Sequence, residues 1–144
     1  TLIPTGELRP VRDTPFDFTN PKLIGEDVNA TNEQIGFGGG FDHCWVMTEA
    51  PTAQIRKVAT LSHQQSGRSM EVHTKEPAIQ FYSGNFLDGT ITGKNEKVYH
   101  QRYGLCLETQ HLPDSPNQGQ FPSTVLKKGE TYSTATKYVF STSN

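Results

Sequence analysis

The stretch Ser69-Met70-Glu71-Val72-His73-Thr74 decides the fold class, because its side chains alternate between apolar and polar. Successive side chains of a β-strand point to opposite faces, so Met70 and Val72 share one face and the polar residues between them share the other. The run from 54 to 62 precedes it, and the connection Gln64-Gln65-Ser66-Gly67 contains the glycine that hairpin loops favour. An antiparallel hairpin is the prediction.

Similar short runs, rich in β-branched and aromatic residues and bounded by turn residues, recur along the chain. They span 41–48, 78–83, 103–109 and 131–141. Thirteen Gly and nine Pro are scattered through the 144 residues, and no window of a dozen residues places apolar side chains at helical spacing. We therefore predict an all-β fold of antiparallel strands, without long helices.

Residues 1–34 differ in character, because four prolines punctuate them and their apolar residues follow neither period. We predict that 1–34 is an irregular lead segment over a sheet, followed by a β-rich segment at 35–144. The length fits a single domain. The sequence begins at Thr1, for which processing, proteolysis and cloning are all open origins.

The composition of the chain excludes two classes of partner, nucleic acid and membrane. Thirteen Lys and Arg against fifteen Asp and Glu give a net charge of -2 without a basic block, so nucleic acid is not expected. Neither a signal peptide nor a run of ~20 apolar residues is present, so no membrane partner is expected. Only 33% of residues are hydrophobic, which predicts limited burial or a face that something else covers.

Cysteine usage indicates the compartment. Cys44 and Cys106 are too few for a disulfide scaffold, so we expect a reduced, cytoplasmic protein. The triplet Asn29-Ala30-Thr31 is the one feature against this, and such triplets are common by chance. The five histidines show no close paired spacing, so no metal is expected.

The run Leu105-Cys106-Leu107-Glu108-Thr109-Gln110 places an acid in a stretch that otherwise has the character of a buried strand. A buried carboxylate is costly without partners. In a low-dielectric site its pKa would rise toward the working pH, as a general base requires. The alternative puts Glu108 on the solvated face of a half-exposed strand, and the residues alone weigh the two equally.

Three glycines precede Asp42 in Gly38-Gly39-Gly40-Phe41-Asp42-His43-Cys44-Trp45, and they allow close approach of the backbone. Alternation puts Asp42 and Cys44 on one face and the aromatic residues on the other. Asp42 is thus a candidate acceptor for substrate hydroxyls, with Trp45 in the core. No Lys-Ser/Thr pair or helix follows the glycines, so they form no phosphate loop.

Gln80 lies inside the apolar run 78–83, and Asn85 lies just beyond it. An amide offers both a donor and an acceptor to a polyol. The alternative is ordinary, since buried glutamines commonly bond to nearby backbone. Aromatic residues around them could stack on a sugar, although core packing is the more common role.

Together these motifs resemble the carboxy-terminal half of the aldose 1-epimerase (galactose mutarotase) family, and the resemblance covers nearly the whole chain. It implies a β-supersandwich that binds aldoses such as galactose and glucose. The reaction that the resemblance implies needs no cofactor. Glu108 matches the family's general base, Asp42 the acid that holds sugar hydroxyls, and Gln80 an amide that contacts the sugar. The motifs are Gly39-Gly40-Phe41-Asp42-His43-Cys44, Ile79 to Phe86, Leu105 to Gln110, Pro113-Asp114-Ser115-Pro116-Asn117 and Leu126 to Tyr132.

One departure matters. The family's general acid is a histidine of the amino-terminal half, and none of the five histidines here lies in a matching motif. The resemblance therefore implies a second chain, or an amino-terminal part of the same protein, that supplies the acid. Two alternatives stay open: a lectin-like sugar-binding module, and glycoside hydrolysis by the carboxylates Asp42 and Glu108.

Overall fold

A computed structural model describes residues 2–48 and 54–143. The strands form two three-stranded sheets, with the orders β1-β4-β5 and β2-β3-β6. The strands are β1 (Asp42–Val46), β2 (Arg56–His63), β3 (Arg68–Thr74), β4 (Ala78–Tyr82), β5 (Cys106–Gln110) and β6 (Thr136–Thr142). The helices are α1 (Ile24–Asp27), α2 (Glu33–Gly38), and the short 3-10 turns η1 (Gln64–Ser66), η2 (Lys94–Glu96) and η3 (Ser115–Asn117). The predicted β-rich fold without long helices is confirmed.

The chain divides into two compact units, and each is described by itself. Unit 1 comprises Thr1–His43 and Gln80–Cys106, and unit 2 comprises Cys44–Ile79 and Leu107–Asn144. Thr1, at the start of the predicted lead segment, lies outside the described residues.

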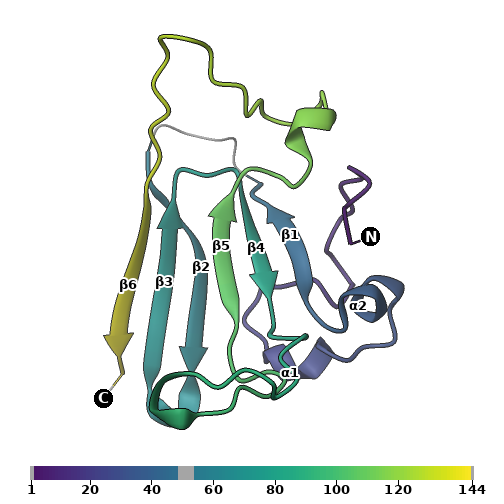
Figure 1. The fold of residues 1–144 in the computed structure, drawn as a ribbon, viewed down its shortest axis with the longest axis vertical. Coiled ribbons are helices and arrows are strands. Elements are labelled where there is room, and N and C mark those ends of the chain that lie inside the picture. Colours follow the sequence, from purple (N-terminus) through teal and green to yellow (C-terminus); the bar gives the residue numbers. More distant parts are fainter. Residues whose placement is uncertain (1, 49–53, 144) are drawn as a thin grey trace. The chain divides into compact units, whose positions relative to one another are not determined.

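The predicted hairpin forms the sheet of unit 2. Strand β2 pairs antiparallel with β3, and β3 pairs antiparallel with β6, so β3 is the central strand. Figure 1 shows these three strands side by side. The hairpin loop closes at Gly67, whose φ of 66° lies in the left-handed region that glycine adopts readily. Val72 and Thr74, on one face of β3, are fully buried.

Two predicted strands begin later than expected. The run 131–141 becomes a strand only at Thr136, because Tyr132 and Thr134 turn their hydroxyls to the carboxylate of Glu76. The run 103–109 becomes a strand only at Cys106, because a turn closes first, with Tyr103 N donating to His100 O. The first residues of β5 and β6 are therefore set by hydrogen bonds to distant residues or within a turn. β-propensity does not predict such hydrogen bonds.

The core of unit 1 is an aromatic cluster. Phe41 is fully buried and stacks on Phe81 with a centroid distance of 5.2 Å. Phe18 meets Phe41 edge to face at 5.3 Å, and Phe16 meets it at 6.0 Å. Edge-to-face and offset contacts of this kind add to the gain from area burial. Phe18 of the lead segment also meets Phe81 of β4 edge to face at 6.0 Å.

The lead segment is not wholly irregular, which corrects that part of the prediction. It contains α1 and the first residues of α2. The side chain of Asn32 caps α2 by accepting from Gln34 N and Ile35 N, and Gly39 ends the helix with φ 63°. Asn at the N-cap and Gly after the last turn are the preferred capping residues, so the signal was present over a span too short for periodicity to detect.

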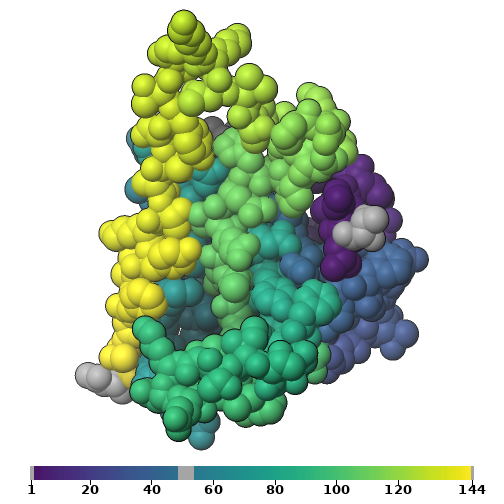
Figure 2. Space-filling view, in the orientation of Figure 1, coloured from purple at the N-terminus to yellow at the C-terminus, as the bar shows by residue number. Residues whose placement is uncertain are grey.

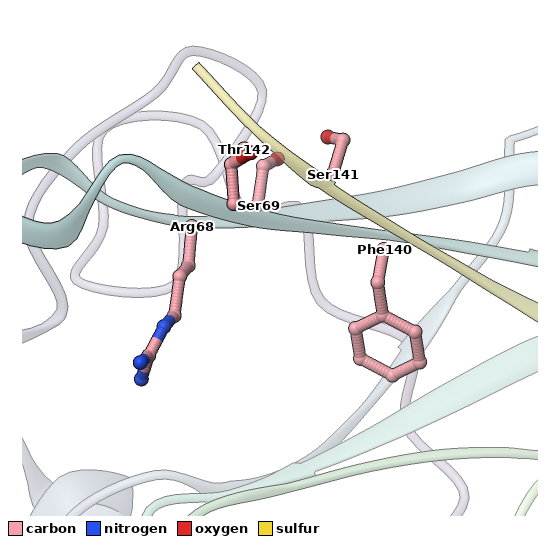
Figure 3. A pocket seen from close by; sticks show the side chains of 5 residues that line it. All are labelled: Arg68, Ser69, Phe140, Ser141 and Thr142. Atoms are coloured by element: carbon pink, nitrogen blue, oxygen red, sulfur yellow. The ribbon is translucent and has the colours of Figure 1, made fainter. Parts of the chain in front are cut away.

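Unit 2 keeps apolar surface in contact with solvent. The side chain of Phe140 is 74% exposed and that of Tyr138 is 44% exposed, both on the edge strand β6. Figure 2 shows this strand (yellow) at the surface. Phe140 and Arg68 project to the same side in Figure 3, in a shallow pocket also lined by Ser69, Ser141 and Thr142. No helix among the described residues is long and apolar enough to cross a bilayer.

The aromatic cluster predicts a large difference between two phenylalanine substitutions. Phe41→Ala empties a fully buried position and should lower the free energy of unfolding by about 3–5 kcal/mol. Phe37→Ala removes a ring that is 63% exposed, so its effect should stay within about 0.5 kcal/mol. Urea unfolding of both variants measures this, and equal losses would contradict the assignment of the core.

Candidate functional site

Asp42 and Gln80, both predicted from the sequence, are brought together by β1 and β4. Gln80 Nε2 donates to Asp42 Oδ1 at 2.8 Å, and both residues are half-buried. The other end of the amide, Gln80 Oε1, is buried and has no hydrogen-bond partner among the described residues. A buried acceptor without a donor is uncommon and calls for an explanation. A ligand hydroxyl would satisfy it while the carboxylate accepts from a second hydroxyl.

His43 lies beside this pair but on the opposite face of the strand. Its ring meets Phe16 at a centroid distance of 4.7 Å, and its Nδ1 accepts from Asp42 N at 3.0 Å. Burial lowers the pKa of His43 more than the nearby Asp42 carboxylate raises it. His43 is therefore neutral near neutral pH, and it packs in the aromatic cluster as the predicted alternation requires.

The backbone just before Asp42 is held by buried polar side chains. Asn85 Nδ2 donates to Gly38 O at 2.8 Å and to Phe41 O at 2.9 Å. Ser83 Oγ accepts from Phe41 N at 3.0 Å. Asn85 was noted in the sequence as a candidate sugar ligand, whereas the structure uses its amide to fix the turn. Arg102 joins this network, and no local sequence pattern marks it.

Glu108 lies on β5, and both Glu108 and Cys106 are exposed. The expectation that the run 105–110 is buried is therefore wrong for this chain. Strand β5 ends the order β1-β4-β5, so it has a sheet neighbour on one side. The side chain of Glu108 makes no hydrogen bond or ion pair within residues 2–48 and 54–143. In this chain Glu108 therefore has the solvated surroundings of the second alternative.

A second carboxylate, Glu76 in unit 2, was missed by the sequence analysis. It is 5% exposed, and three side chains donate to it. His111 Nδ1 lies 2.8 Å from Oε2. Tyr132 OH donates to Oε1 at 2.6 Å, and Thr134 Oγ1 donates to the same oxygen at 2.5 Å. Burial raises the pKa of Glu76, but the hydrogen bonds from Thr134, Tyr132 and His111 together outweigh burial and hold the pKa below its ordinary value. The donors lie far along the chain, so nothing local in the sequence identifies them.

Cys44 is not a reactive thiol, and the described part of the chain holds no cluster of metal-binding side chains. Burial raises the pKa of Cys44 to about 11, against a smaller lowering by a hydrogen bond with Gln110. Cys44 is thus a thiol at neutral pH and a poor nucleophile. No three His, Cys, Asp or Glu side chains gather as a metal site within residues 2–48 and 54–143.

Comparison with known proteins adds a family match. Residues 1–139 match the family model for aldose 1-epimerase. The chain is 47% identical over 141 residues to a galactose mutarotase of Mus musculus and 44% identical to one of Homo sapiens. An aldose 1-epimerase of Escherichia coli is 36% identical over 140 residues. The mammalian alignments cover 98% of this chain but 39% of each relative, so the chain spans about two fifths of their length.

A solved structure agrees with this match. The GalM/aldose epimerase homologue from C. elegans aligns with a TM-score of 0.80 at 30% identity, and the alignment covers 99% of this chain and 41% of that one. This likeness confirms the predicted fold class.

The Glu76 cluster predicts a pH dependence of stability. Because the folded pKa of Glu76 lies below its unfolded value of about 4.3, the carboxylate contributes stability above that pH and loses it as the pH falls further. Glu76→Gln should cost about 1–3 kcal/mol at pH 7, and the difference from the wild type should shrink toward pH 3. Chemical unfolding at several pH values measures this.

Glu26→Gln, on the exposed surface of α1, serves as the control for that series. It should leave the pH curve close to that of the wild type. Parallel curves for the wild type and Glu76→Gln, with a constant gap from pH 7 to pH 3, would contradict a stabilising Glu76 carboxylate.

Proposed function

The chain belongs to the aldose 1-epimerase family, and from this premise we propose that it is the carboxy-terminal part of an enzyme interconverting the α and β anomers of hexoses such as galactose and glucose. The observation that carries the proposal is the Gln80–Asp42 pair, with its 2.8 Å hydrogen bond and the unsatisfied Gln80 Oε1. The relatives named galactose mutarotase and aldose 1-epimerase support the same reaction. Residues 1–144 then form part of one epimerase domain.

In the proposed reaction Glu108 acts as the general base. It takes the proton of the anomeric hydroxyl, the freed electron pair forms the carbonyl bond, and the bond from the anomeric carbon to the ring oxygen breaks. The ring oxygen takes a proton from a general acid. Rotation about the bond next to the carbonyl carbon and reversal of the steps give the other anomer, so no metal or nucleotide is consumed. Asp42 accepts hydrogen bonds from sugar hydroxyls, and Gln80 Oε1 accepts another.

The general acid is proposed to come from the remaining part of the protein. Each histidine of this chain has another neighbour that accounts for its place. His43 packs among the aromatic rings, His63 bonds to Ser66, His73 to Glu71, His111 to Glu76, and His100 packs on Tyr103. The relatives are more than twice as long as this chain, which leaves room for a donor and for a cover over the exposed Glu108.

A non-catalytic, lectin-like module is the second candidate. Two observations favour it. Asp42 and Gln80 form a polar pair that could bind a sugar, and the exposed Glu108 lacks the surroundings of a catalytic base. Calorimetry with galactose, run beside polarimetry, separates the two functions. Binding without faster anomer exchange in the full-length protein would select the module.

Glu108→Gln tests the role of the base. In the full-length protein the substitution should lower kcat for mutarotation of α-D-galactose by roughly 100- to 10,000-fold, with KM little changed, because the amide keeps the shape but takes no proton. Polarimetry on freshly dissolved sugar measures the rate. Glu96→Gln, at another exposed glutamate, is the matched control. A kcat near that of the wild type would rule Glu108 out as the base.

The missing acid gives a further prediction. Residues 1–144 alone should accelerate mutarotation far less than the full-length protein, because one positioned acid typically contributes roughly 100- to 10,000-fold. Both proteins are compared at equal concentration in the same polarimetric assay. Full activity of the 144 residues alone would show that this chain already contains the proton donor.

A further inference from the structure

The half-buried side chain of Arg102 donates four hydrogen bonds. Its Nη2 donates to Gly39 O and to Asn29 Oδ1, each at 3.0 Å. Its Nη1 donates to Ser83 Oγ at 3.0 Å and to Asn85 Oδ1. All four acceptors are neutral, so the guanidinium here joins backbone and amide groups in fixed directions instead of pairing with a carboxylate. A planar fork of donors suits that task, whereas a lysine ammonium offers only one point.

The acceptors converge on the turn that leads into Asp42. Arg102 holds Gly39 directly, and Asn85, one of its acceptors, holds Gly38 O and Phe41 O. The packing is close. A Cβ added to Gly40, where φ is +140°, would lie 2.5 Å from Arg102 Nη1 and 2.4 Å from Asn85 Oδ1. The glycine at this position therefore lets the guanidinium network touch the backbone itself.

The backbone of Arg102 is a second, independent observation. Its φ of 68° lies in the left-handed region, which is unfavourable for a residue with a Cβ. Arg102 N donates to Gly84 O at 3.1 Å, which fixes this conformation beside the network. Strained residues of this kind persist where the surrounding structure requires them, and they gather at functional sites.

We propose that Arg102 is a positioning residue for the sugar site. Its guanidinium fixes the turn from Gly38 to Phe41 and so sets the direction of the Asp42 carboxylate, which meets both Gln80 and the sugar hydroxyls. Arg102 does not touch the sugar. This inference rests on the proposed function, since it takes Asp42 as the residue that holds the substrate.

The consequence is a defect in binding more than in turnover. Asp42 directly follows Phe41 in the sequence. If the turn from Gly38 to Phe41 changes conformation, the Asp42 carboxylate moves out of its hydrogen bond with Gln80. A small misplacement of a substrate-holding group can cost roughly 100-fold. An interaction made equally in the bound sugar and in the transition state raises KM and leaves kcat nearly unchanged when it is lost.

Arg102→Gly is the decisive variant, because glycine tolerates the left-handed backbone and so removes the guanidinium while relieving strain. In the full-length protein we expect KM and Kd for D-galactose to rise roughly 10- to 100-fold, with kcat within about threefold of the wild type. Arg102→Lys keeps the positive charge but lacks the planar set of donors, so its KM and Kd should lie between those of the wild type and those of Arg102→Gly. Arg12→Gly, at an exposed arginine of unit 1, is the matched control and should leave both constants unchanged.

The outcomes separate the possible failures. If Arg102 serves only to keep the chain folded, Arg102→Gly lowers the folded fraction and thus kcat, with KM and Kd unchanged, and the inference is overturned. Unchanged constants throughout overturn it as well. If the wild type binds galactose by calorimetry but does not speed mutarotation, the proposed reaction fails, and a raised Kd for Arg102→Gly still supports the positioning role.

Discussion

The hydrogen bond from Gln80 to Asp42 is the constraint on which the rest of the proposed site depends. It joins two strands through residues that lie 38 positions apart in the sequence, and it uses the amide nitrogen of Gln80. The amide oxygen is then left buried with no donor among the described residues. A buried acceptor without a donor costs free energy. A sugar hydroxyl would satisfy this oxygen, which supports the proposed sugar site.

Glu76 and Glu108 show why burial alone does not identify a catalytic acid. Glu76 is buried, but hydroxyls and a histidine satisfy both of its oxygens, so its charge serves the packing of the segment before β6. Glu108 is exposed and has no partner in the described chain, so its carboxylate is available to a substrate proton. The proposed base is the less constrained of the two. The chain spans about two fifths of the length of its relatives, and the proposed remaining part would add to the surroundings of Glu108.

Alternation and turn chemistry predicted much of the fold. The pattern around Val72 and the glycine at 67 were enough for the hairpin, and the opposite faces of Asp42 and His43 followed from strand geometry. What sequence reasoning missed depends on groups distant along the chain. The guanidinium of Arg102 and the donors to Glu76 act across tens of residues, and no periodicity encodes such contacts. The residues alone left the exposure of Glu108 open, because an apolar run predicts a strand but not what covers it.

The most direct test of the central claim is a crystal structure of the full-length protein with D-galactose bound. We expect a sugar hydroxyl within hydrogen-bond distance of Gln80 Oε1, a second hydroxyl on the Asp42 carboxylate, and the anomeric hydroxyl facing Glu108. A sugar bound elsewhere, with Gln80 Oε1 satisfied by a protein group, would contradict it.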